Sequence, residues 1–217
     1  MTKTGEAARP PMISDPDSLL DTFQLYRKQI TIGAIVVAAV AGGTFLWQAS
    51  SARKSAQAEK AFFDAIALYS QGDPKAATDL AAVATRYKGT PGGVQAAMIL
   101  AQSHFDGGKF DDGLKVLDGV SSAGVFASGL ESLKAAGYEG KQQFDKAAEH
   151  YLAAVAKASL SGEKDSLKGE AARALTAAGK KAEALKIWEE LAAKVDSPMA
   201  GEARVRIGEL SATVVKN

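Results

Sequence analysis

GKFDDGLKVL, residues 108–117, is matched 34 positions later by QQFDKAAEHY, residues 142–151. Phe110 corresponds to Phe144 in this pair, and Asp111 corresponds to Asp145. Two degenerate copies flank the pair, GDPKAA at residues 72–77 and GKKAEAL at residues 179–185. Self-similarity at a nearly fixed period predicts a stack of repeated structural units.

Each copy places small residues where two helices of a hairpin would cross. In the first helices these are Ala65, Ala101, Ala135 and Ala172, and in the second helices Ala77, Gly113, Ala147 and Ala184. A partner residue follows four positions later in the second helices: Ala81, Leu117, Tyr151 and Trp188. Turn glycines separate the helices at Gly72, Gly107-Gly108, Gly140 and Gly179, since glycine adopts the left-handed conformation that ends a helix.

A helical hairpin with a period of 34 residues is typical of the tetratricopeptide repeat. We therefore predict an all-α fold, with about four hairpins in a solenoid over residues 53–217. A capping helix, residues 199–210, would close it by burying Ala203 and Ile207. The alternative is an alanine-rich bundle whose spacings coincide by chance.

The longest uncharged stretch, residues 29–52, predicts a transmembrane helix. Residues 30–47 are nearly all apolar, and eighteen helical residues span about 27 Å, close to the hydrocarbon thickness of a bilayer. Basic pairs at residues 27–28 and 53–54 flank the stretch. A buried core helix and a cleaved signal peptide are the alternatives, but the stretch is long and lacks a small-residue cleavage site.

Two further features lie in or before this stretch. Residues 1–14 carry no periodic pattern and predict a flexible arm, whereas residues 15–28 predict an amphipathic juxtamembrane helix. The apolar stripe of that helix, which would contact lipid or a partner, consists of Leu19, Leu20, Phe23 and Tyr26. A row of small residues within the span, Ala34, Ala38 and Gly42, would admit another transmembrane helix, unless it only reflects the composition of the span.

Positive charge flanks both ends of the span, so charge alone leaves the orientation open. A long C-terminal domain translocates largely regardless of its charge, whereas a short arm is easily retained. We therefore expect a cytoplasmic N-terminus and a repeat domain on the outer side of the membrane.

Composition argues against several classes of function. The net charge of +1 gives no field that would attract nucleic acid, and the absence of cysteine excludes disulfides and thiolate metal sites. His104 and His150 fall in different repeats, without the spacing of a metal-binding motif. No phosphate-binding loop, dinucleotide fingerprint or nucleophile elbow occurs. We expect no enzymatic activity, cofactor, metal or small-molecule substrate.

The order of these features resembles the YfgM-like family over roughly residues 17–212. The resemblance rests on a short arm, one span with an Arg53-Lys54 exit, the run AEKAFFDA at residues 58–65, and Thr90-Pro91 before a first helix. It implies a single-span bacterial inner-membrane protein with a periplasmic repeat domain. It also implies partners near the protein-translocation and periplasmic chaperone machinery, and no catalytic residues.

The repeat register predicts a binding groove along the first helices of the hairpins. Its residues would be Gln95, Met98, Gln102, Phe105, Arg173 and Thr176, a mixture suited to an extended peptide or a partner helix, unless these positions pack against the next helix. Two functions follow. The chain is an adaptor that binds clients or chaperones transiently, or an accessory subunit held permanently in a large respiratory or photosynthetic membrane complex.

Overall fold

The computed structural model describes the backbone of residues 16–214 and the side chains of residues 36–212. Contacts divide the chain into two compact units between Ser51 and Ala52, one residue from the predicted start of the repeat domain. The predicted arm, residues 1–14, lies outside the described residues.

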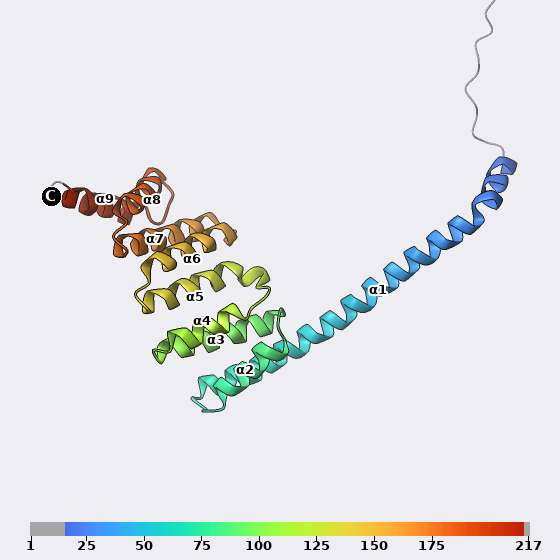
Figure 1. Ribbon diagram of the computed structural model, residues 1–217, viewed down its shortest axis with the longest axis horizontal. Coiled ribbons are helices and arrows are strands. Elements are labelled where there is room, and N and C mark those ends of the chain that lie inside the picture. The colour runs from blue at the N-terminus through green and yellow to red at the C-terminus, as the bar shows by residue number, and fades with distance from the viewer. Residues whose placement is uncertain (1–15, 215–217) are drawn as a thin grey trace, which may run out of the picture. The chain divides into compact units, whose positions relative to one another are not determined.

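A single helix, α1 (Pro16–Ser70), runs through this division (Figure 1). No break separates the predicted juxtamembrane helix from the predicted span, because neither glycine nor proline interrupts residues 17–32. Large apolar side chains of its first unit are exposed, with Phe45, Leu46 and Trp47 each about 70% accessible. Among the residues whose side chains are described, no helix is both long and apolar enough to cross a membrane. Residues 29–35 of the expected span lie outside that part of the chain.

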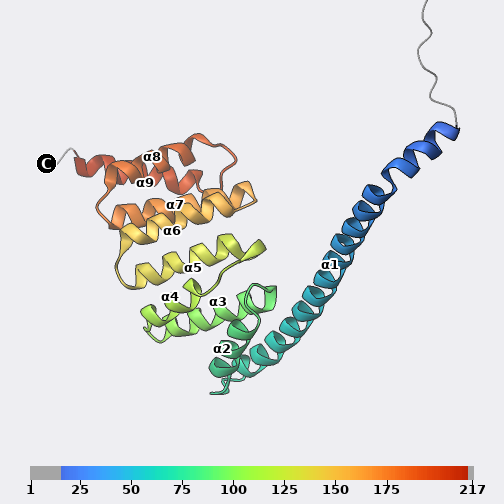
Figure 2. The same ribbon diagram turned by 45° about the vertical axis from the view of Figure 1, so that its right-hand side comes forward.

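The second unit is a solenoid of helical hairpins, all-α within its described residues (Figure 2). The end of α1 pairs with α2 (Ala76–Arg86), α3 (Pro91–Asp106) with α4 (Phe110–Asp118), α5 (Ala127–Gly140) with α6 (Phe144–Lys157), and α7 (Ser161–Ala177) with α8 (Lys181–Ala193). A short 3-10 helix, η1 (Gly124–Phe126), precedes α5, and α9 (Ala200–Val214) closes the stack. The matched phenylalanines Phe110 and Phe144 each begin the second helix of a hairpin, as their 34-residue spacing predicts.

Local signals explain some of the helix boundaries. Thr90 caps α3 by accepting a hydrogen bond of 3.2 Å from the Gly93 amide, and Pro91 opens the helix. Gly108 turns the second hairpin with φ +71°. The third hairpin differs from the prediction, because the left-handed residue is Gln142 (φ 58°) and Gly140 lies within α5. Gly140 is needed for space, since a Cβ there would lie 2.1 Å from the Phe110 ring.

The crossing residues are buried in the later three hairpins as predicted. Ala101, Ala135 and Ala172 in the first helices are fully buried, as are Gly113, Ala147 and Ala184 in the second helices. In the first hairpin Ala65 is buried as predicted, but the predicted register of the second helix is wrong by one residue. Ala76 and Leu80 are buried there, whereas Ala77 is exposed and Ala81 only half-buried. The turn after α1 has five residues, 71–75, whereas the turns of the other three hairpins have three, and no single residue type signals this difference.

The core of the solenoid consists of three clusters along the stack. The first lies between α1, α2 and α3, the second between α3, α4 and α5, and the third runs from α5 to α9. Ten of the sixteen buried residues in the third cluster are alanines, so its helices approach closely around Trp188. The closing helix buries Ala203, and Ile207 is half-buried.

Partly buried ion pairs join the helices of the third cluster to one another and to the loop after α8. Asp165 on α7 is 2% exposed and accepts a hydrogen bond of 2.6 Å from Lys194, which follows α8. Burial acts to raise the pKa of Asp165, but hydrogen bonds from Lys194 and Ser197 outweigh it and hold the pKa below its usual value. Between α5 and α6, Glu131 is bonded to His150 at 2.8 Å and Lys157 at 2.6 Å.

Gly113→Ala tests the close crossing of α3 and α4. A Cβ at Gly113 would lie 2.3 Å from the Phe105 ring and 2.9 Å from the Ala101 carbonyl oxygen, so the substitution should cost about 1–3 kcal/mol of unfolding free energy. The measurement is the thermal unfolding midpoint of the full chain in mild detergent. Gly208→Ala is the matched control, because nothing lies within 4 Å of a Cβ there and its midpoint should hold or rise. Equal midpoints for the two variants would contradict the tight crossing.

Asp165→Asn tests the buried ion pair. Because the folded pKa lies below the ordinary value of 3.8, the stabilisation is complete above about pH 4 and is lost as the pH falls through the folded pKa. The variant should lose about 1–3 kcal/mol at pH 7 and show a shallower decline in stability below pH 4. The control is Asp196→Asn, at an exposed carboxylate in the loop that follows α8. It should change neither the stability at pH 7 nor the decline in stability below pH 4. An unchanged acid profile for Asp165→Asn would show that the pair contributes nothing.

Candidate functional site

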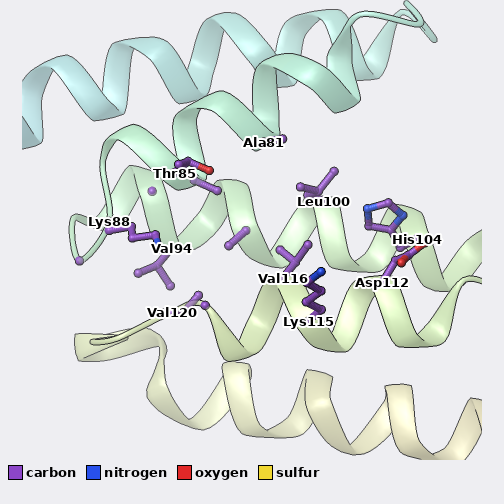
Figure 3. A pocket seen from close by; sticks show the side chains of 15 residues that line it. Ala81, Thr85, Lys88, Val94, Leu100, His104, Asp112, Lys115, Val116 and Val120 are labelled. Carbon is purple, nitrogen blue, oxygen red and sulfur yellow. The ribbon is translucent and has the colours of Figure 1, made fainter.

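A cavity opens between α2 and α4 and is floored by α3. Its volume is about 480 Å³, within the range of binding pockets. Figure 3 shows Val94 and Leu100 of α3 between Ala81 and Thr85 of α2 and Val116 of α4. We call this cavity the α2–α4 groove.

Small residues leave the space that forms the α2–α4 groove. Ala81 and Ala84 on α2 and Ala97 on α3 line the groove, where longer side chains would fill the volume. Val94, Leu100 and Val116 give the groove an apolar lining. The groove can therefore bury aliphatic side chains of a partner, with a stabilisation of roughly 25 cal/mol per Å² of apolar surface removed from water.

Three charged side chains and one histidine lie along this lining, and none of them has a partner in the described part of the chain. Lys88 lies near one end of the groove, Lys115 near its middle, and Asp112 with His104 near the other end (Figure 3). Most other lysines of the later repeats, such as Lys134 and Lys157, form ion pairs with acidic side chains. The unpaired groups leave charge available to orient a bound segment.

Four predicted groove residues on α3 lie outside the α2–α4 groove. Gln95 and Gln102 donate within their own helix, to the Pro91 carbonyl at 3.4 Å and to Asp106 at 2.8 Å. Met98 packs half-buried against the second core cluster. Phe105 is 8% exposed, and its ring fills the space beside Gly113 and Gly137. The structure therefore places Phe105 in the core and not on a binding surface.

The other two predicted groove residues, Arg173 and Thr176, line a second cavity. This cavity of about 320 Å³ lies between α7, α8 and α9, and we call it the α7–α9 cavity. The Arg173 guanidinium donates to Glu170, and at 2.6 Å to Glu202 on α9. The hydrogen bond from Arg173 lowers the pKa of Glu202 despite partial burial. This network ties the closing helix to the last hairpin.

The predicted membrane-contact residues lie on α1. Ala38 and Gly42 are exposed, and nothing lies within 4 Å of a Cβ built on Gly42. The remaining ones, Leu19, Leu20, Phe23, Tyr26 and Ala34, lie outside the residues whose side chains are described.

The sequence analysis missed the residues that form the α2–α4 groove. The available signal was the pair Ala81 and Ala84, small residues on one side of α2. The register error in the first hairpin assigned Ala81 to the core, which hid this signal. The groove-lining residues of α3 were missed because the prediction placed the binding surface on another side of that helix.

The described residues contain no group of three or more His, Cys, Asp or Glu side chains that could hold a metal ion. His150 stacks on Tyr138, with ring centroids 5.1 Å apart, and bonds Glu131, so it joins α5 to α6. The titratable groups of the α2–α4 groove form no hydrogen-bonded pair of the kind that general acid–base catalysis uses.

Comparison with known proteins agrees with this architecture. Two similar solved structures are the TPR-like repeats of a putative kinesin light chain from Podosopora anserina and a single-substitution variant of them. Both have a TM-score of 0.56 and cover 75% of this chain and 89% of theirs, at 16% and 15% identity, which shows a common fold alone. No curated protein matches the chain by sequence. A family model described as "Tetratricopeptide repeat-like domain" matches residues 22–209, and the chain therefore belongs to that family.

Proposed function

We propose that this chain is a non-enzymatic, membrane-anchored scaffold that binds other proteins through its repeat domain. The observation that carries the proposal is the open α2–α4 groove, with aliphatic walls and with Lys88, Lys115 and Asp112 unpaired among the described residues. Tetratricopeptide-like domains typically act in protein–protein interaction. The occupant that suits this groove is an amphipathic helix or extended segment of a partner, with aliphatic residues inward and an acidic residue near the lysines.

The anchor would be residues 29–52. Their lack of charge and the flanking basic pairs support a single span. The exposure of Phe45, Leu46 and Trp47 on α1 also supports it, because three large apolar side chains in succession are costly to leave in water. The match to the family begins at residue 22, before the span.

The setting we propose is the bacterial inner membrane, with the arm cytoplasmic and the repeat domain periplasmic. The resemblance to the YfgM-like family supports partners at the translocation machinery and periplasmic chaperones. A second candidate function is a permanent accessory subunit of a larger membrane complex. It is supported by the uncovered small-residue face of α1 at Ala38 and Gly42, which would admit a partner helix closely.

The groove is tested by Ala84→Leu in the tagged full-length chain, purified in mild detergent. The added side chain fills the α2–α4 groove from α2, so co-purifying proteins should fall by about tenfold, a change of about 1.4 kcal/mol. Ala77→Leu is the control, because Ala77 is exposed on the same helix. Mass spectrometry of the eluates, at equal bait, gives the readout. Equal recovery with both variants would refute binding through the groove.

The two candidate functions separate with Ala38→Leu. A larger side chain on the small-residue face should release a permanent subunit from its complex on a native gel, and should leave groove-dependent binding intact. Val40→Leu lies roughly 200° away around the helix and serves as the control. The adaptor is supported if the parent chain and both variants migrate mainly as small species on the native gel, with the same substoichiometric partners. A single large complex that Ala38→Leu disrupts supports the accessory subunit.

A further inference from the structure

Trp188 on α8 is the largest of the fully buried side chains and carries an unsatisfied donor. Its indole Nε1–H has no hydrogen-bond acceptor within the described part of the chain. A buried donor without a partner costs about 1–3 kcal/mol, so its presence calls for an explanation. Trp188 lines the α7–α9 cavity, where a bound group could supply the acceptor.

Thr176 offers the complementary group at the same cavity. Its hydroxyl donates to the Ala172 carbonyl at 2.8 Å, and this leaves the lone pairs of Oγ1 free to accept a hydrogen bond. Ala177 and Leu210 add apolar surface to the lining. The cavity therefore combines one donor, one acceptor and an apolar wall.

The charges around the cavity disfavour an anion. Arg173 and Arg206 are the two cations, and each is already bonded to carboxylates. Three acidic residues, Glu170, Glu202 and Glu209, surround them, so the cluster carries one negative charge in excess. A bound carboxylate would face that excess, whereas a neutral amide would not.

We propose that the α7–α9 cavity binds a neutral secondary amide with an aliphatic substituent, its C=O accepting from Trp188 Nε1 and its N–H donating to Thr176 Oγ1. An internal stretch of a polypeptide presents this chemistry at every aliphatic residue. This inference rests on the proposed scaffold function. The cavity would be a second contact point for an extended partner, separate from the α2–α4 groove. A C-terminal residue, with its carboxylate, would bind there more weakly.

The test uses the full-length chain with Trp47→Phe in mild detergent, so that Trp188 gives the only indole resonance in a nitrogen-15 spectrum. The probes are N-acetyl-leucine N-methylamide, which is neutral, and N-acetyl-leucine, which is a carboxylate at pH 7. The indole resonance should shift in a saturable manner with the amide, and the acid should bind at least about tenfold more weakly.

Two variants show whether the response comes from the cavity. Ala177→Leu fills it from the exposed side of α7 and should abolish the shift while Trp188 stays in place. Thr176→Val removes the acceptor and should weaken amide binding several-fold. Ala193→Leu, at an exposed position on α8, should bind like the parent. Thermal midpoints of all variants confirm that the third cluster remains folded.

The outcomes are separable from those of the groove. No saturable shift, equal binding of amide and acid, or an unchanged response in Ala177→Leu would each overturn the proposal and leave a water molecule as the partner of the indole. If Ala84→Leu still loses its co-purifying proteins, the scaffold function stands without this site. If the amide binds and Ala84→Leu retains its co-purifying proteins, the α7–α9 cavity is a binding site and binding through the α2–α4 groove is refuted.

Discussion

The close crossing of paired helices is the constraint on which the rest of the fold depends. A methyl group at Gly113 would clash with the Phe105 ring, and a methyl group at Gly137 on α5 would clash with the same ring. Alanine fills the equivalent positions elsewhere, so helix axes approach without large side chains between them. This explains how a chain with only 7% aromatic residues builds a dense core. Other small residues, such as Ala81 and Ala84 on α2, leave the space of the α2–α4 groove.

The sequence was sufficient for the architecture because the repeat recurs in physical terms. Phe110 and Phe144 begin equivalent helices, and the small crossing residues recur one turn later. The errors arose where two helix registers would bury the same residue types, so that the sequence pattern fitted both. Ala76 and Ala77 are identical side chains, so pattern alone could not choose between them. Gly140 looked like a turn residue and instead serves to admit an aromatic ring, a role visible only once α4 and α5 are packed together.

The candidate site was less predictable than the fold. Arg173 and Thr176 line the α7–α9 cavity, and their role in binding a partner stays a prediction. Phe105 was misplaced because its helix is apolar on several sides, and burial on α3 is decided by which neighbours are present. The α2–α4 groove exists because small residues leave a space between two helices, and such a space produces no recognisable sequence motif. The small size of Ala81 and Ala84 was its only trace in the sequence.

The division of the core into three clusters has a consequence for how the molecule responds to load. Among the described residues, adjoining clusters share one residue each, Val116 between the first and second and Tyr138 between the second and third. Repeat arrays whose units contact only their neighbours open in steps instead of all at once. A force or a protease acting on the first hairpin can therefore unravel it while the alanine-rich cluster around Trp188 stays closed. Unfolding that begins in the first hairpin would therefore halt at the last repeats.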